Sequence, residues 1–362
     1  MVNQHIPPVR PGRGAPTNAS STRFNLNSRE LDGDWLDACQ SIDDPAAQLS
    51  TTVTEEFPKS ILSFNSSPDL PFDRSVNAYR GCEHGCVYCY ARPSHAYHDL
   101  SPGLDFESRL FAKPNAAMLL RKTMAKKGYR ALPIAIGTNT DPYQPIERTY
   151  RITREILKLC LETRHPIVIT TKSARVLDDK DLLVELSNLG LSSVAISITS
   201  LDPKLAARLE PRASTPTKRL EAVRSLVNAG VHVHVNLAPI IPGLTDNEIE
   251  HIVAAAAAHG ASSISWIPIR LPHELSELFC NWLEVHFPDR AKKVMNIIRD
   301  MRGGKDNDPD YFSRMRGQGA WADLIRTRVK IAVRKSQLNN SPWSARNDLF
   351  CPPDLDGQLS LF

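Results

Sequence analysis

From about residue 75 the chain alternates short apolar, β-branched runs with longer amphipathic stretches. The runs predict strands at residues 76–79, 132–137, 166–170, 193–199, 231–238 and 263–267. The stretches between them predict helices at residues 114–127, 148–163, 178–188, 217–229 and 246–259. Strand and helix alternating at intervals of roughly thirty residues are typical of parallel βα units. The pattern therefore predicts an α/β fold with six parallel strands.

The carboxyl ends of these strands carry polar residues. Six βα units fit either an open doubly wound sheet or an incomplete α/β barrel, and both architectures collect chemistry at that edge. After the second strand come Thr138, Asn139 and Asp141, and after the third come Thr171 and Lys172. The fourth strand ends with Ser197 and Thr199. Residues 236–239 follow the fifth strand, and residues 268–270, the last of which is Arg270, follow the sixth. We expect the functional site at this edge.

Outside this region the periodic pattern fades. Residues 1–60 are rich in Pro, Gly, Ser, Asn and Asp, so we expect a largely disordered N-terminal region. The βα units are expected to occupy residues 61–290, a basic helical extension residues 291–340, and a flexible tail residues 341–362.

The composition is that of an ordinary globular chain of 362 residues, 41% of them hydrophobic. No run approaches the roughly eighteen apolar residues of a membrane span, and no secretory signal is recognisable, so we expect a cytoplasmic protein without membrane contact. The net charge of +4 does not by itself indicate a nucleic-acid partner. Basic residues nevertheless cluster at 121–130 and 314–335, which are either solvated helix faces or contacts for an anionic partner.

The stretch richest in chemistry is GCEHGCVYCYARPSHAYH, residues 81–98. Its Cys82, Cys86 and Cys89 have the spacing CxxxCxxC, and the seven cysteines of the chain make a poor disulfide framework. Three thiolates are one fewer than a structural zinc site or a four-cysteine iron–sulfur cluster uses. A cubane cluster on three cysteines keeps one iron open to another ligand. Two alternatives are a redox thiol pair and a zinc site completed by a histidine, namely His84, His95 or His98.

CEHGCVYCY, after a strand and before a series of βα units, resembles the signature of the radical S-adenosylmethionine (SAM) enzymes. Other motifs resemble the spore photoproduct lyase-like group of that family, often labelled DNA repair photolyases. These motifs are GTNTDPYQPIE after the second strand, TTKS after the third, SITSLDPKLAARLEPRASTPTKRLEAVRSL after the fourth and APIIPGLTD after the fifth. The resemblance covers about residues 75–269. It implies a partial (βα)6 barrel of the TIM type, with a [4Fe-4S] cluster on Cys82, Cys86 and Cys89. It also implies SAM bound at the open iron and cleaved reductively to a 5′-deoxyadenosyl radical.

The same resemblance implies roles for single residues. Tyr88 and Tyr90 stand where the lyase has tyrosines beside SAM that are implicated in passing a hydrogen atom. Both are therefore predicted to be catalytic, and Tyr88 also to contact the cofactor. Lys172 and Ser197 are expected to contact the carboxylate and ribose region of SAM, and Asn139 to line that site.

One position departs from the lyase pattern. The lyase has a hydrogen-donating cysteine just before the polar stretch after its second strand, and the corresponding residue here is Gly137. Cys160 and Cys280 lie in later helical segments and are expected to be small buried hydrophobic residues. We therefore expect a different route for hydrogen return, or a different substrate.

Two residue pairs leave alternatives open. His232 and His234 in VHVHV share one face of the fifth strand, as a metal site or, the interpretation we favour, as histidines packed between sheet and helix. Glu210 and Arg212 in EPRAS either orient a substrate or close a loop through an ion pair.

The final residues, QLSLF, resemble the sliding-clamp-binding peptide of bacteria. In that resemblance the amide of Gln358 sets the register, while Leu359, Leu361 and Phe362 fill an apolar groove. The alternative is that these residues fold back onto the parent domain. A clamp-tethered protein would be held at DNA, where the basic segment could meet phosphates through Arg314, Arg316, Arg326, Arg328 and Lys330.

The leading hypothesis is a radical SAM enzyme that acts on DNA, in a repair-like or modifying reaction, while tethered to the clamp. The implied partners are DNA, the clamp and an electron donor such as flavodoxin or ferredoxin. The alternatives are radical modification of RNA or protein, and a clamp-associated DNA-binding protein with a structural cluster.

Overall fold

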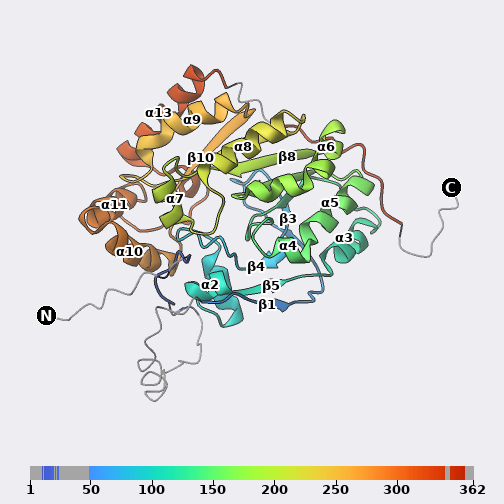
Figure 1. The fold of residues 1–362 in the computed structure, drawn as a ribbon, viewed down its shortest axis with the longest axis horizontal. Coiled ribbons are helices and arrows are strands. Elements are labelled where there is room, and N and C mark those ends of the chain that lie inside the picture. The colour runs from blue at the N-terminus through green and yellow to red at the C-terminus, as the bar shows by residue number, and fades with distance from the viewer. Residues whose placement is uncertain are drawn as a thin grey trace, which may run out of the picture.

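The computed structural model describes residues 10, 12–19, 21, 23, 49–338 and 343–354 (Figure 1). Its main sheet has seven strands. In spatial order they are β10 (Ser263–Pro268), β9 (His232–Ile240), β8 (Ser192–Ser197), β7 (Ile167–Thr171), β6 (Ile134–Ile136), β3 (Arg74–Val76) and β2 (Leu62–Phe64). All neighbours from β3 to β10 pair in parallel, and only β2 is antiparallel. The prediction of an α/β fold with six parallel strands in a partial barrel is confirmed.

The first predicted strand, 76–79, is divided between two sheets. Its start belongs to β3, whereas Tyr79 belongs to β4 (Tyr79–Arg80) in a small sheet of order β1-β5-β4. The other two strands are β1 (Thr52–Glu55) and β5 (Arg109–Ala112). Asn77 marks the division, because its side chain bonds Thr138 Oγ1 at 3.1 Å and the Asn139 N–H at 2.9 Å. The chain therefore leaves the main sheet just before the cysteine loop.

The helices between the strands match the apolar pattern. They are α3 (Ala116–Met124), α4 (Glu147–Tyr150), α5 (Ile152–Glu162), α6 (Lys180–Asn188), α8 (Pro216–Val227) and α9 (Ile249–Ala258). Shorter turns of helix are η1 (Arg92–His98), α2 (Leu104–Ser108), η2 (Ala174–Asp179), α7 (Pro203–Leu209) and η3 (Asp246–Glu248). The apolar sides of the longer helices bury one continuous core against the sheet.

His232 and His234 of β9 lie on the face of the sheet that points away from the helices, not on the helix-covered face that we favoured. Val233 and Val235 of that strand pack in the core with the helices, and alternation places His232 and His234 on the opposite face. His232 bonds a serine hydroxyl of β8 at 2.9 Å, and His234 bonds two serine hydroxyls of β10 at 2.7 and 2.8 Å. The interpretation as histidines packed between sheet and helix is therefore wrong. Both rings contribute to a polar ladder across the other face.

The C-terminal part of the described chain is helical. It contains α10 (Leu275–His286), α11 (Pro288–Asp300), α12 (Ser313–Arg316) and α13 (Gly319–Lys335). The basic helix α13 lies alongside α9 and buries Ala322, Ile325 and Val329 (Figure 1). Of the tail, residues 343–354 are described, and they lie against the main domain: Cys351 N–H bonds the Thr163 carbonyl at 2.9 Å.

In the described part of the chain no helix is both long and apolar enough to cross a membrane.

A buried ion pair holds the cysteine loop to α2. The side chains of Arg92 and Glu107 are fully buried and bond each other. The guanidinium also donates to the carbonyl oxygens of Gly85 and Cys86, at 3.2 and 2.9 Å. One arginine thus satisfies backbone acceptors that burial would otherwise leave unpaired.

An N-terminal segment completes this arrangement. The backbone N–H groups of Gly14 and Ala15 donate to the Glu107 carboxylate at 2.9 and 2.8 Å. A Cβ atom at Gly14 would lie 1.7 Å from the carbonyl oxygen of Gly85, so only glycine fits between the segment and the cysteine loop. Within the region expected to be largely disordered, the described residues 12–19 therefore have a defined place.

Glu107→Gln should destabilise the protein by about 3–5 kcal/mol, because it leaves the buried Arg92 cation without its counter-charge. The measurement is urea unfolding followed by circular dichroism. Glu250→Gln is the matched control. Glu250 pairs with Arg328 and keeps 45% of its side chain exposed, so the control should lose no more than about 1 kcal/mol. Equal losses in the two variants would contradict the role given to Glu107.

Candidate active site

Three free thiols lie together in the loop between β4 and η1. Cys82 and Cys86 are buried. Cys89 is half-buried and packs against both apolar clusters, the one that contains Cys82 and the one that contains Cys86. Burial, then Asp141, then the other two thiols raise the pKa of Cys82 well above its ordinary value. Burial and then Glu210 raise the pKa of Cys86. Buried thiols that resist ionisation need a cation to stabilise their thiolates, which bound iron would provide.

Residues 138–144, after β6, hold the backbone of this loop. Thr140 donates its hydroxyl to the Gly81 carbonyl at 2.6 Å, and Gln144 donates to the same oxygen at 3.3 Å. The Gln144 amide oxygen accepts the Glu83 N–H at 2.9 Å. The motif GTNTDPYQPIE thus binds the cysteine loop directly, although sequence spacing alone did not indicate this contact.

Asp141 links the cysteine loop to the end of β7. It accepts the Lys172 N–H and the Thr171 hydroxyl, each at 2.7 Å, and its carboxylate lies 3.3 Å from His84 Nδ1. Burial alone would raise the pKa of Asp141, but His84 and these hydrogen bonds lower it to about 2. The carboxylate therefore stays ionised and fixes two strand ends relative to the thiols.

The histidines considered as a fourth zinc ligand have other partners. His84 pairs with Asp141, the Nε2 atom of His95 lies 2.9 Å from the Arg109 carbonyl oxygen, and the His98 ring packs on Phe111. In the residues that the structure covers, no three His, Cys, Asp or Glu side chains are grouped as ligands of one metal ion. Because these three histidines are engaged elsewhere, three thiolates on a multi-iron cluster fit the loop better than a zinc site closed by one of them.

Tyr88 is the centre of a buried network on the β8 side of the loop. Its hydroxyl donates to Glu210 and lies 3.0 Å from Thr199 Oγ1. Glu210 forms a buried ion pair with Arg219, which also donates to the Ser197 carbonyl at 3.0 Å. This network fixes the aromatic ring between the second and third cysteines.

Lys172 lies above that ring, with its Nζ atom 5.7 Å from the centre of the Tyr88 ring. Burial acts to lower the pKa of Lys172, but Cys86 and Glu210 together raise it, so the ammonium stays charged. In turn burial would raise the pKa of Glu210, whereas Arg219 and Lys172 lower it to about 2. A cation is therefore held between the thiols and a buried carboxylate.

Sequence reasoning missed this pairing. We considered Glu210 with Arg212, but Arg212 lies 3.0 Å from Glu83 and Glu210 pairs with Arg219 of α8. Arg219 looked like one of several basic residues on an amphipathic helix, and only packing shows that it is buried. The EPRAS loop is thus closed by two ion pairs to different elements.

The remaining predicted residues lie at the same edge of the sheet. Asn139, Lys172 and Ser197 follow or end β6, β7 and β8, which are neighbours in the sheet. Tyr90 is 53% exposed and donates its hydroxyl to the Thr138 carbonyl. Tyr88 and Tyr90 therefore contact different strands, one on each side of Cys89.

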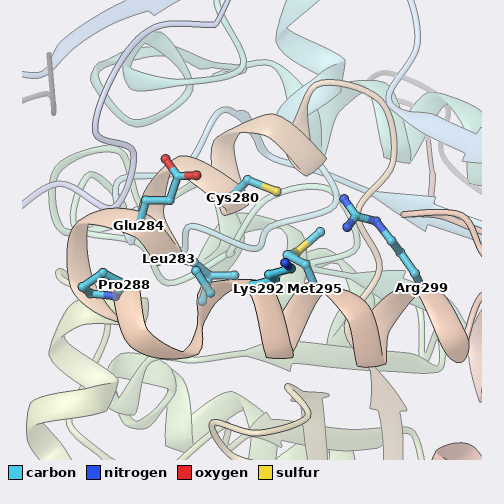
Figure 2. A pocket seen from close by; sticks show the side chains of 8 residues that line it. Cys280, Leu283, Glu284, Pro288, Lys292, Met295 and Arg299 are labelled. Atoms are coloured by element: carbon cyan, nitrogen blue, oxygen red, sulfur yellow. The ribbon is translucent and has the colours of Figure 1, made fainter. Parts of the chain in front are cut away.

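Gly137 is required by the backbone. Its φ is +94°, and a Cβ atom there would lie 2.1 Å from the Thr170 carbonyl oxygen. Cys160 is fully buried in the core, as expected. The expectation for Cys280 is wrong: it is half-buried and lines a pocket of about 370 Å³ between α10 and α11, with Met295 and Arg299 (Figure 2). Neither thiol replaces the one that Gly137 excludes.

Comparisons with known proteins agree with this geometry. The chain matches the family model described as the Radical SAM superfamily over residues 76–256. An uncharacterized protein of Mycobacterium tuberculosis is 34% identical over 80% of each chain. An uncharacterized protein of Methanocaldococcus jannaschii is 28% identical over 61% of this chain and 79% of the relative. The solved structure of spore photoproduct lyase complexed with dinucleoside spore photoproduct is similar with a TM-score of 0.56 and 15% identity, over 78% of this chain and 79% of the other. At that identity the likeness shows a shared fold.

Gly137→Cys, which restores the residue type expected from the lyase pattern, should destabilise the protein by at least about 2 kcal/mol in urea unfolding, because the new Cβ collides with backbone. Gly128→Cys is the control. Gly128 also has a positive φ, of +81°, but no atom lies within 4 Å of the position that a Cβ would take there, so it should cost only about 1 kcal/mol. A Gly137→Cys protein as stable as this control would show that the strand end can accommodate a thiol.

Proposed function

The chain belongs to the radical SAM superfamily, and we propose that it applies the chemistry of that family to DNA. The cofactors of the family are a [4Fe-4S] cluster and SAM. Reductive cleavage of SAM at such a cluster supplies a 5′-deoxyadenosyl radical. The observation that carries the proposal is the trio of thiols, two buried and one half-buried, beside a charged lysine and the ends of parallel strands, with the three nearby histidines engaged by other described residues.

Each predicted site residue has a physical role in this proposal. Cys82, Cys86 and Cys89 would hold the cluster through their thiolates. Lys172 would bind a carboxylate of the cofactor, because burial strengthens its charge-assisted hydrogen bonds. The network around Tyr88 keeps its ring in place and its phenol protonated, since burial and then Glu210 raise the pKa of Tyr88. Asn139 and Ser197 offer further polar groups to SAM from the neighbouring strand ends.

DNA is the substrate that the shared fold favours. The similar solved structure is of a lyase complexed with a dinucleoside photoproduct. The exclusion of a thiol at Gly137 favours a reaction that returns no hydrogen atom from that position, so the lesion or product would differ from that of the lyase. Tyr90, half exposed beside Cys89, is the protein group best placed for a hydrogen-atom relay toward a substrate.

Part of the basic surface expected to meet DNA is already neutralised. Arg314 is paired with Asp69, Arg326 with Asp323, and Arg328 with Glu250. The outer face of α13 is therefore a weaker candidate for phosphate contacts than its sequence indicated.

We also propose that the chain binds the bacterial sliding clamp through Gln358, Leu359, Leu361 and Phe362. These residues lie outside the described part of the structure. The last described segment packs on the main domain, with the Phe350 ring 5.4 Å from the ring of His165. The described chain thus comes within a few residues of the peptide while still in contact with the segment after α5.

Anaerobically reconstituted protein, reduced with dithionite and given SAM and ultraviolet-irradiated DNA, should form 5′-deoxyadenosine and change the mass of nucleosides in the digested DNA. Cys86→Ala should lose the activity and most of the bound iron. The control Cys351→Ser, which replaces an exposed cysteine, should keep both. If protein with a full complement of iron forms no 5′-deoxyadenosine, the proposal that it is a SAM-cleaving enzyme is refuted. If 5′-deoxyadenosine forms but no DNA is altered, only the choice of substrate fails.

Deleting residues 358–362 should reduce binding to a purified bacterial sliding clamp by at least about tenfold in surface plasmon resonance, because the groove loses its apolar occupants. Replacing Ser360 alone by alanine is the control and should change binding less than about twofold, since the motif leaves that position unspecified. Undiminished binding after the deletion would refute the clamp proposal, and the SAM-cleaving activity should be the same in all three proteins.

A further inference from the structure

Arg270 is a half-buried cation at the mouth of the barrel, and none of the described residues forms an ion pair with it. It follows β10, at the edge of the main sheet where residues after β6 hold the cysteine loop. Its Nε atom is buried without a hydrogen-bond partner, and its Nη1 atom is 3.5 Å from the weak acceptor Sδ of Met315. No carboxylate among the described residues is close enough to form an ion pair with it, and Asp69 and Asp308 act on it only from farther away.

This state is unfavourable in the free protein. Burial, and then the nearby charge of Arg314, lower the pKa of Arg270. The buried arginines that hold the cysteine loop and the Tyr88 network, Arg92 and Arg219, each have a carboxylate partner. Arg270 is only half-buried, but its enclosed and unpaired Nε atom still carries a desolvation cost that an anionic ligand can offset.

The surroundings of Arg270 indicate the kind of ligand. Tyr90 lies at the same edge of the main sheet, with its hydroxyl on the Thr138 carbonyl just after β6. Two more aromatic side chains, Tyr311 and Phe312, lie in the adjoining loop and are 52% and 61% exposed. The Arg314 guanidinium stacks 4.9 Å from the centre of the Tyr311 ring. Exposed rings interleaved with arginines are typical of surfaces that bind single-stranded or extruded nucleotides.

This aromatic loop is held firmly in place. Asp69 accepts the Phe312 N–H at 3.1 Å and binds the Arg314 guanidinium at 2.6 and 2.7 Å. Arg302 donates to the Arg314 carbonyl at 2.8 Å and to the Ile269 carbonyl at 2.7 Å, which ties the loop to the end of β10. The exposed rings are thus presented by anchored backbone beside Arg270.

We propose that Arg270 binds a phosphate of the nucleic-acid substrate, with Tyr90, Tyr311 and Phe312 stacking on the adjacent bases. The inference rests on the proposed function and adds the contact that orients the substrate toward the thiol loop. A carboxylate of SAM is the other available anion. Lys172 already lies beside the thiols at the end of β7, and β8 and β9 separate that strand from β10, roughly 14 Å along the sheet.

The test measures binding of reconstituted protein to a fluorescein-labelled thymine-rich oligonucleotide, single-stranded and duplex, by anisotropy at several salt concentrations. Arg270→Gln should weaken binding about tenfold and reduce the salt slope by about one unit. Arg270→Lys should restore part of the affinity. Phe312→Ala, a separate exposed change, should weaken binding about fivefold without changing the slope. The control Lys158→Gln removes a cation of α5 that is already paired with Glu155 and should stay within about twofold of the wild type.

SAM binding, measured by equilibrium dialysis on the same proteins, separates the two anions. Unchanged SAM affinity together with weaker oligonucleotide binding supports the proposal. Weaker SAM binding by Arg270→Gln with unchanged oligonucleotide binding overturns it, because the anion is then the carboxylate of the cofactor. Equal oligonucleotide binding by wild type and Arg270→Gln overturns this inference alone. A wild-type protein that binds no oligonucleotide overturns it too, and removes the DNA substrate of the proposed function while leaving SAM cleavage intact.

Discussion

The structure of the site depends on one buried ion pair, between Arg92 and Glu107. A loop that must present three thiols to one group has few regular backbone hydrogen bonds, and its carbonyl oxygens still need partners once buried. Arg92 supplies them, and Glu107 both neutralises Arg92 and accepts two N–H groups from the N-terminal segment. The three cysteines are therefore correctly placed only when this ion pair is formed. The N-terminal segment with Gly14 and Ala15 is part of the same support.

Charge compensation organises the rest of the mouth. Near the thiols, the single carboxylate of Glu210 faces two cations, Arg219 and Lys172, which leaves one positive charge for an anionic group of the cofactor. On the β10 side, Arg270 has no such partner among the described residues, and we propose that the ligand supplies the missing charge. One edge of the sheet can thus hold two anionic groups at different places. In our proposals, the buried network orients the cofactor, while the arginine with its exposed rings selects the substrate.

The chain shares its family with the lyase, but at Gly137 it departs from the lyase pattern. The strand end there approaches the neighbouring backbone so closely that no side chain fits, which means that the difference from the lyase is built into the barrel. A thiol could not be gained at this position without moving β7. In the proposed function, radical formation depends on the cysteine loop, and the later fate of the radical on residues such as the half-exposed Tyr90.

The sequence by itself determined the order of strands and helices, the three cysteines and the strand ends at which chemistry collects, because these follow from local spacing and periodicity. It also identified Lys172, Asn139 and Ser197 as neighbours, since parallel strands end at one edge. It did not identify Arg219 as the partner of Glu210, the face on which His232 and His234 lie, or the place of Gly14 against Gly85. Those depend on which side chain is buried and what it meets, and residues far apart in the chain are brought together only by tertiary packing. For the same reason Arg270 was one polar residue among many in the sequence, and only the folded protein leaves it without a counter-ion.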